Sequence, residues 1–143
     1  MRFWDTSALI PLLVREEGTE LVASWLRDDP EVVLWGLTRL EIVSAVERRA
    51  REGLLVAAQR AALLKKAQRL TEAAHEVSDL PAVRGRAIAL MARHPLRAAD
   101  AAQLGAAMLV ADPDPSRLTM VVLDRRLAQA AVREGLEVLT WPE

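Results

Sequence analysis

Cysteine is absent from this sequence of 143 residues, which excludes a disulfide framework and any metal site built from thiolates. An excess of charge of either sign is lacking too, because 19 Lys and Arg residues face 20 Asp and Glu residues. Any binding of RNA or DNA therefore requires a local basic patch. No uninterrupted apolar run approaches the roughly 18 residues of a membrane span. The chain also reaches Asp5 without a signal-peptide pattern, so we expect a cytoplasmic protein with no membrane association.

Short apolar runs alternate with segments of helical periodicity along the whole chain. The runs that favour buried strands are residues 2–4, 31–35, 75–78, 119–124 and 136–140. Helices are expected at 6–14, from 19 onward, and at 38–51, 56–73, 81–93, 97–110 and 125–135, with a loop at 111–116. This alternation predicts an α/β fold in which helices cover both faces of a parallel sheet of about four to five strands. Residues 1–143 are expected to form one domain.

Four acidic residues occupy positions that otherwise carry no charge: Asp5, Glu41, Asp100 and Asp124. Two of them close apolar runs (MRFWD and MVVLD), and two lie in mostly apolar helical segments (TRLEIVSAV and RAADAAQLGAAML). Burying a lone carboxylate is expensive, and no block of Lys or His is available to pair with these acids. A divalent cation explains them economically and indicates metal-dependent phosphate chemistry.

Helix capping is an alternative explanation for each acid taken alone. Asp5 and Asp124 end strands and precede helices, where an N-cap is expected. Glu41 follows Thr38 by three residues, which is the spacing of a capping box, and Asp100 lies in a first helical turn, where the helix dipole favours an acid. Capping and metal binding are compatible for Asp5 and Asp124, whereas they compete for the Glu41 carboxylate.

The four acids considered together favour a metal site. In a parallel α/β sheet the carboxyl ends of strands and the amino ends of the following helices share one edge, where ligands bind. Four carboxylates at that edge would repel one another and raise each other's pKa values without a counter-charge. Mg²⁺ or Mn²⁺ fits this requirement because hard cations prefer oxygen ligands and retain waters for chemistry.

The acids also belong to motifs in a recognisable order. The first strand ends in Asp5-Thr6-Ser7, Glu41 lies early in a central helix, and L-R-A-A-D-A (96–101) contains Asp100. D-R-R-L follows a late strand at 124–127, and Gly135 precedes the last strand. Over essentially the whole chain, this ordered set resembles the PIN-domain ribonucleases, and in particular the VapC toxins of type II toxin–antitoxin pairs.

The resemblance implies a metal-dependent endoribonuclease that hydrolyses RNA phosphodiester bonds with Mg²⁺ or Mn²⁺. Asp5 and Asp100 would be direct ligands, and Glu41 and Asp124 would complete the site. It further implies inhibition by a small antitoxin protein from a neighbouring gene, and a homodimer. The chain departs from the family at Val122, where a Thr or Ser is usual two residues before the last Asp.

Supporting residues have two interpretations each. Ser7 and Thr38 are candidates for hydrogen bonds behind the acids, although Thr38 could equally be a cap. Arg97, Arg125 and Arg126 flank the acids and could bind phosphates, or they could simply form a solvated helix surface.

The aromatic and histidine residues near strand and helix ends favour structural roles. Trp4 and Trp35 could stack on a base, but packing in the core or at an interface is the expected role. His75 and His94 stand in no triad context and are expected at the surface.

Other classes of protein also gather acids at strand ends. A phosphoacceptor receiver domain needs a Lys after a late strand, yet Lys65 and Lys66 lie in the helix 56–73. A haloacid-dehalogenase phosphatase needs D-x-D after the first strand, where Ser7 stands. Asp112 and Asp114 form a Toprim-like D-x-D, but the two prolines beside them favour a loop. A PIN-like binding module with weak catalysis and a housekeeping RNA-processing nuclease both remain alternatives.

Overall fold

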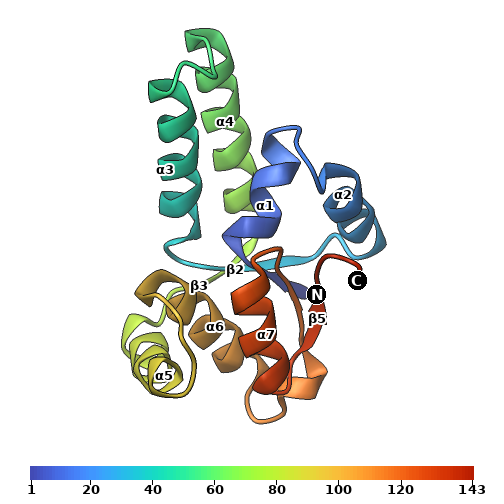
Figure 1. The fold of residues 1–143 in the computed structure, drawn as a ribbon, viewed down its shortest axis with the longest axis vertical. Coiled ribbons are helices and arrows are strands. Elements are labelled where there is room, and N and C mark those ends of the chain that lie inside the picture. Colours follow the sequence, from blue (N-terminus) through green and yellow to red (C-terminus); the bar gives the residue numbers. More distant parts are fainter.

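A computed structural model describes the chain over residues 1–143. Its centre is a five-stranded sheet in which every pairing is parallel, with the strand order β3-β2-β1-β4-β5 (Figure 1). The strands are short: β1 (Arg2–Trp4), β2 (Val32–Trp35), β3 (His75–Val77), β4 (Thr119–Val121) and β5 (Glu137–Leu139). The predicted α/β fold with a parallel sheet of four to five strands is therefore confirmed.

Seven α-helices connect and follow the strands, close to the positions predicted from periodicity. They are α1 (Thr6–Leu13), α2 (Thr19–Asp28), α3 (Thr38–Arg51), α4 (Ala57–Ala73), α5 (Leu80–Arg93), α6 (Ala98–Ala111) and α7 (Arg125–Arg133). The segment expected as a loop before β4 contains one turn of 3-10 helix, η1 (Pro115–Arg117). Helices α3 and α4 pack side by side and project from the rest of the molecule (Figure 1). None of the helices combines the length and apolar character needed to cross a membrane.

Successive residues along each strand point alternately into two separate hydrophobic cores, one on each face of the sheet. Phe3, Val33 and Met120 point to the core formed with α5, α6 and α7. Trp4 and Leu34, their neighbours along the strands, point to the core formed with α1 to α4. Both faces of the sheet are thus buried, which explains why the strands read as nearly continuous apolar runs.

Strand β1 occupies the middle of the sheet because the chain adds β2 and β3 on one side and then crosses to add β4 and β5 on the other. Trp4 pairs with Val121, so the carboxyl ends of β1 and β4 are adjacent. The loops that leave these two strands therefore begin side by side. In open α/β sheets this reversal of strand order is where ligands bind.

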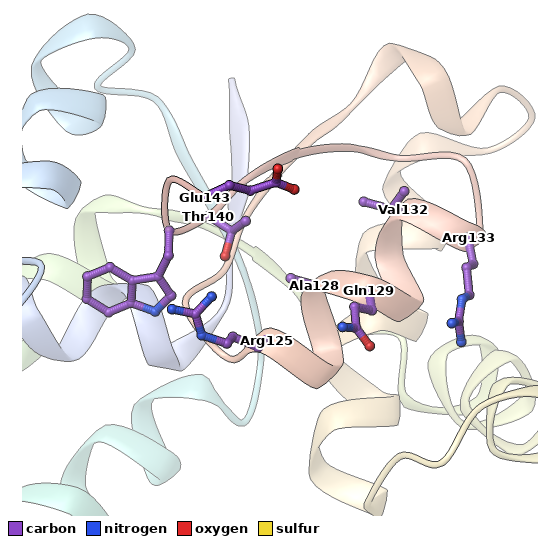
Figure 2. A pocket seen from close by; sticks show the side chains of 8 residues that line it. Arg125, Ala128, Gln129, Val132, Arg133, Thr140 and Glu143 are labelled. Carbon is purple, nitrogen blue, oxygen red and sulfur yellow. The ribbon is translucent and has the colours of Figure 1, made fainter.

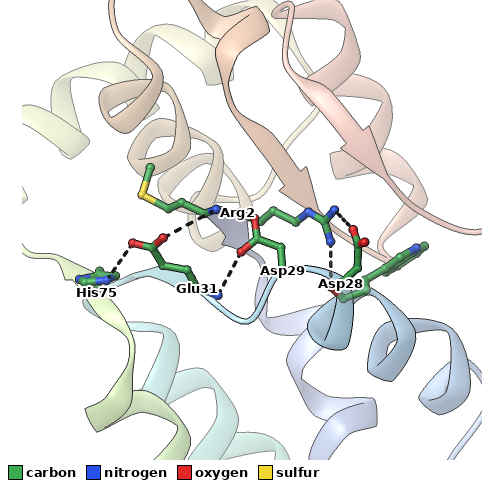
Figure 3. Close-up of polar contacts among 7 residues, drawn as sticks. Arg2, Asp28, Asp29, Glu31 and His75 are labelled. Atoms are coloured by element: carbon green, nitrogen blue, oxygen red, sulfur yellow. Dashed lines mark hydrogen bonds and ion pairs between the residues drawn. The ribbon is translucent and has the colours of Figure 1, made fainter.

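The opposite edge of the sheet, at the amino ends of the strands, pairs its charges closely (Figure 3). Arg2 bonds to Asp28 and donates to the carbonyl oxygen of Trp25 at 2.8 Å. Glu31 lies 3.3 Å from the ring of His75, and Asp29 contacts the terminal amine. Asp28, Asp29 and Glu31 each have a cationic partner here, which provides a comparison for the acids at the other edge.

Candidate metal and phosphate site

Asp5 leaves strand β1 and caps helix α1. Its Oδ2 accepts hydrogen bonds from the backbone N–H of Ser7 at 3.0 Å and from the Ser7 hydroxyl at 2.5 Å. The residue is only 4% exposed. Burial raises the pKa of Asp5 to about 7, with smaller contributions from the charges of Glu41 and Asp100, against the lowering effect of Ser7. An acid in this environment gains strongly from a nearby cation.

Asp124 caps helix α7 through a hydrogen bond from the backbone N–H of Leu127 to its Oδ1 at 2.8 Å. It is exposed, and the loop that carries it is held by Ser7. The Ser7 hydroxyl accepts from the backbone N–H groups of Leu123 and Asp124 at 2.9 and 3.1 Å. Val122, at the position where the family usually has a hydroxyl, is fully buried in the core. The hydroxyl that supports the Asp124 loop is therefore supplied by Ser7, just after the end of β1.

Glu41 lies in the first turn of α3 but does not cap it. The helix begins at Thr38 with Leu37 as N-cap, and no side chain bonds to its first N–H groups. The capping-box interpretation of Thr38 and Glu41 is therefore wrong, and both side chains turn inward to Gln103 instead. Burial raises the pKa of Glu41, while hydrogen bonds from Thr6 and Gln103 lower it and the charge of Asp100 raises it further.

Asp100 lies in the first turn of α6, as expected, and is partly buried. Burial and the charge of Asp124 raise its pKa, whereas the guanidinium groups of Arg97 and Arg126 lower it. The charge of each acid thus affects the pKa of at least one other acid or is affected by it. Asp5 interacts electrostatically with Glu41 and Asp100, and Asp100 interacts with Asp124. The structure therefore brings all four predicted acids to one edge of the sheet.

These four carboxylates have no cation within ion-pair distance, in contrast to the acids at the amino edge. All the ion pairs of the molecule lie elsewhere. No three acidic or His side chains converge closely enough to form a complete ligand set by themselves. A Mg²⁺ site needs less than that, because this ion is commonly bound by one or two carboxylates and keeps several waters. The donor set is made only of oxygen, which fits Mg²⁺ or Mn²⁺.

Basic residues lie beside the acids on the same surface. Arg97, Arg125 and Arg126 line a hollow of about 350 Å³ together with Asp100 and Asp124. Arg125 also reaches a second cavity of similar volume, between α7 and the C-terminal segment (Figure 2). Figure 2 shows the Arg125 side chain directed toward Thr140 and the neighbouring aromatic side chain at the strand end. Arg125 thus borders both the hollow beside the acids and the cavity next to α7.

The aromatic residues considered for base stacking are structural. Trp4 and Trp35 are buried on opposite faces of the sheet, as expected for core residues. The surface expectation for His94 is wrong, because this side chain is only 8% exposed. Its Nε2 lies 2.7 Å from the Glu134 carboxylate, which links the end of α5 to the end of α7. His75 is exposed, as expected.

Gln103 is a site residue that the sequence interpretation missed. It is fully buried in α6 and contacts Glu41, Thr6 and Thr38. A polar residue within an apolar helical run was the signal that identified the acids, and the same signal applies to Gln103. The sequence interpretation considered only charged residues within apolar segments, and the Gln103 amide is neutral.

Comparison with known proteins decides the family. The PIN domain model matches residues 2–133. The chain belongs to the PIN domain family. A search of curated proteins found no match.

Several solved structures share this PIN fold. A toxin–antitoxin complex from Klebsiella pneumoniae has 18% identity and a TM-score of 0.63, with 90% of this chain and 91% of that chain covered. FitAcB from Neisseria gonorrhoeae has 18% identity and a TM-score of 0.69, with coverages of 97% and 96%. VapBC2 from Rickettsia felis, bound to a DNA fragment from its promoter, has 9% identity and a TM-score of 0.66, with coverages of 99% and 98%. At these identities the similarity concerns the fold.

Proposed function

We propose that this PIN domain is a metal-dependent endoribonuclease that hydrolyses RNA phosphodiester bonds. One observation carries the proposal: four carboxylates lie at the ligand-binding edge of the sheet, and none of them has a cation within ion-pair distance. The family supports it, since PIN domains are generally nucleases. Mg²⁺ or Mn²⁺ is the expected ion because only oxygen ligands are present.

The roles of the acids follow from their positions. Asp5 and Asp100 would bind the ion, and Glu41 and Asp124 would hold it or its waters. The bound ion would activate water and neutralise the scissile phosphate. Asp5 would shift to its charged form when a cation binds, so metal binding should release protons near neutral pH.

The arginine side chains provide the contacts to RNA. Arg97 and Arg126 lie beside Asp100, where their guanidinium groups can bind phosphate oxygens of the substrate. Arg125 extends this positive surface toward the cavity on α7 (Figure 2). These contacts recognise the charge of the RNA phosphates and not the RNA sequence. They therefore account for binding of RNA without specifying which RNA is the target.

The biological role we propose is that of a toxin in a toxin–antitoxin pair, acting in the cytoplasm. The Klebsiella neighbour is described as a toxin–antitoxin complex, and the Rickettsia neighbour as VapBC2. An antitoxin from a neighbouring gene would inhibit most simply by placing an Arg or Lys against the unpaired carboxylates. An amphipathic segment laid between helices would supply the remaining affinity. A homodimer is expected, and sedimentation of the purified chain tests it.

The enzymatic proposal is tested with the purified chain and single-stranded RNA. Cleavage should require Mg²⁺ or Mn²⁺ and stop with EDTA. Asp100→Asn should remove activity and retain the fold, because it keeps the shape of the side chain while weakening ligation. Asp112→Asn is the matched control, since Asp112 is exposed and pairs with Arg86 away from the acids. Full activity of the Asp100→Asn protein would contradict the assignment.

The toxin proposal is tested in cells. Expression of the wild-type chain should arrest growth, and co-expression with the neighbouring gene should relieve the arrest. Asp5→Asn should be harmless and still bind the neighbour's product. If the wild-type chain is harmless at high expression but cleaves RNA in vitro, a housekeeping nuclease replaces the toxin. If it does neither, a binding module replaces both.

A further inference from the structure

Gln103 places a single amide between the elements that carry the acids. It lies three residues after Asp100 in α6, and its side chain is fully buried. Its Nε2, which carries two N–H groups, lies within hydrogen-bond distance of three oxygens: Oγ1 of Thr6 at 3.0 Å, Oγ1 of Thr38 at 3.0 Å and Oε1 of Glu41 at 3.1 Å. The two N–H groups are therefore shared among these three acceptors. The Thr6 hydroxyl bonds to the Glu41 carboxylate as well.

These contacts connect the first turns of α1 and α3 to the second turn of α6. Thr6 follows Asp5 directly and begins α1, and Glu41 lies in the first turn of α3. Gln103 itself extends from the helix that begins beside Asp100. One side chain therefore fixes the relative positions of the three helix ends that present Asp5, Glu41 and Asp100.

The amide is not explained by stability of the fold. Its Oε1 is buried and has no hydrogen-bond partner. A buried acceptor left without a partner destabilises the folded state, and an apolar side chain of the same shape would avoid that cost. The other buried residues of α6 are Ala, Leu and Gly. A purely structural role would be served better by such an apolar residue.

We propose that Gln103 is a positioning residue that holds the Glu41 carboxylate in the orientation needed to bind a divalent ion. This inference rests on the proposed metal-dependent function. An amide suits the task because it donates a hydrogen bond without carrying charge. A Lys or Arg in the same place would neutralise Glu41 and compete with the metal, whereas Gln103 leaves the negative charge available. Residues behind metal ligands commonly change metal affinity about 10- to 100-fold when they are replaced.

A packing role for Gln103 is the competing explanation, because the amide also contacts Thr6 and Thr38. The two roles differ in whether replacing Gln103 changes metal affinity by way of the Glu41 carboxylate. A packing role would persist in a protein that lacks the Glu41 carboxylate. A positioning role would disappear there, because no carboxylate remains to be oriented.

The experiment measures Mn²⁺ affinity of the full chain by calorimetry, together with the shift in melting temperature caused by Mn²⁺. Gln103→Met keeps the approximate size of the side chain and removes the donor, and it should raise the Kd for Mn²⁺ about tenfold or more. Leu104→Val is the matched control, since Leu104 is the next residue of the same helix and is fully buried. It should lower stability and leave the Kd unchanged. Should Gln103→Met fail to fold, Gln103→Asn keeps the amide but shortens its reach and takes its place.

The decisive comparison is a double-mutant cycle with Glu41→Gln. Adding Gln103→Met to that variant should change the Kd by less than about twofold. An unchanged Kd in Gln103→Met alone, or an equal fold-change with and without the Glu41 carboxylate, overturns the positioning role. Wild-type protein that binds no Mn²⁺ would instead contradict the proposed function itself, so the two failures are distinguishable.

Discussion

The Ser7 hydroxyl links the Asp5 carboxylate to the backbone of Asp124, which lies 117 positions after Ser7. It donates to the Asp5 carboxylate at 2.5 Å and accepts from the backbone N–H of Asp124 at 3.1 Å. Two strand ends that are neighbours in the sheet are thereby held together by one oxygen atom. This hydroxyl is the single direct polar link between the first and last acids of the site.

Removing that hydroxyl should damage both stability and catalysis. Ser7→Ala leaves the N–H groups of Leu123 and Asp124 without their acceptor, which should lower the free energy of unfolding by about 1–3 kcal/mol. Turnover of RNA should fall as well, because the Asp124 loop loses its anchor. Ser7→Thr retains a hydroxyl and serves as the control in chemical denaturation and cleavage assays. Equal behaviour of the Ala and Thr variants would contradict this role.

The metal-free protein should lose stability as pH rises toward neutrality. Asp5 has a pKa of about 7 in the folded state, above its unfolded value of 3.8. Between these values the unfolded chain releases its proton while the folded chain retains it, so stability falls with increasing pH. The full effect is on the order of 4 kcal/mol and is reached above the folded-state pKa.

Asp5→Asn isolates this contribution. The variant should be more stable than wild type at pH 7.5 in EDTA and should lose most of the decline between pH 4 and 7, because Asn cannot ionise. Thermal melting across this range measures it. A parallel decline in both proteins would show that Asp5 is not the group responsible.

Glu41→Gln should fold normally and cleave poorly. The side chain caps no helix, and burial raises its pKa, so removing its charge should not lower the stability of the metal-free protein. Turnover should fall tenfold or more, each factor of ten being about 1.4 kcal/mol of barrier. Glu47→Gln is the control on the same helix, because Glu47 pairs with Arg60 on the surface. A Glu41→Gln protein with wild-type turnover removes this residue from the site.

Arg126→Gln should weaken RNA binding more than it slows the chemical step. Arg126 lies beside Asp100 and faces the hollow that we assign to the substrate phosphates. The KM for RNA should rise, and the salt dependence of binding should become shallower by about one phosphate contact. Arg51→Gln removes the same charge at the outer end of α3 and should leave both quantities unchanged.

Glu134 gives a test of structure that is independent of the acids. Its carboxylate bonds to Arg93 and to the buried His94, which ties α5 to α7. Glu134→Gln should lower the free energy of unfolding by about 1–3 kcal/mol, with Mn²⁺ affinity unchanged. The pKa of Glu134 is lowered by these partners, so its stabilising effect should fade as pH falls into the acidic range. A change in Mn²⁺ affinity would contradict the claim that the Glu134 contacts are independent of the four acids.

Sequence alone predicted the order of the elements and the edge at which the acids meet. Both follow from local information, since apolar runs define strands and a parallel sheet places their carboxyl ends together. The choice between capping and metal binding for Glu41 could not be made locally. It depends on Gln103, which lies 62 positions away and becomes a neighbour only in the folded chain. The burial of His94 was missed for the same reason, because Glu134 is 40 positions distant.

The late addition of β4 beside β1 also has a consequence for synthesis in the cell. The central strand is made first, but its neighbour β4 and the last acid, Asp124, come near the end of the chain. A polypeptide interrupted anywhere before β4 carries at most three of the acids and lacks the partner strand that completes the site. A truncated chain therefore lacks the complete set of carboxylates, and the candidate site forms only when synthesis is nearly finished.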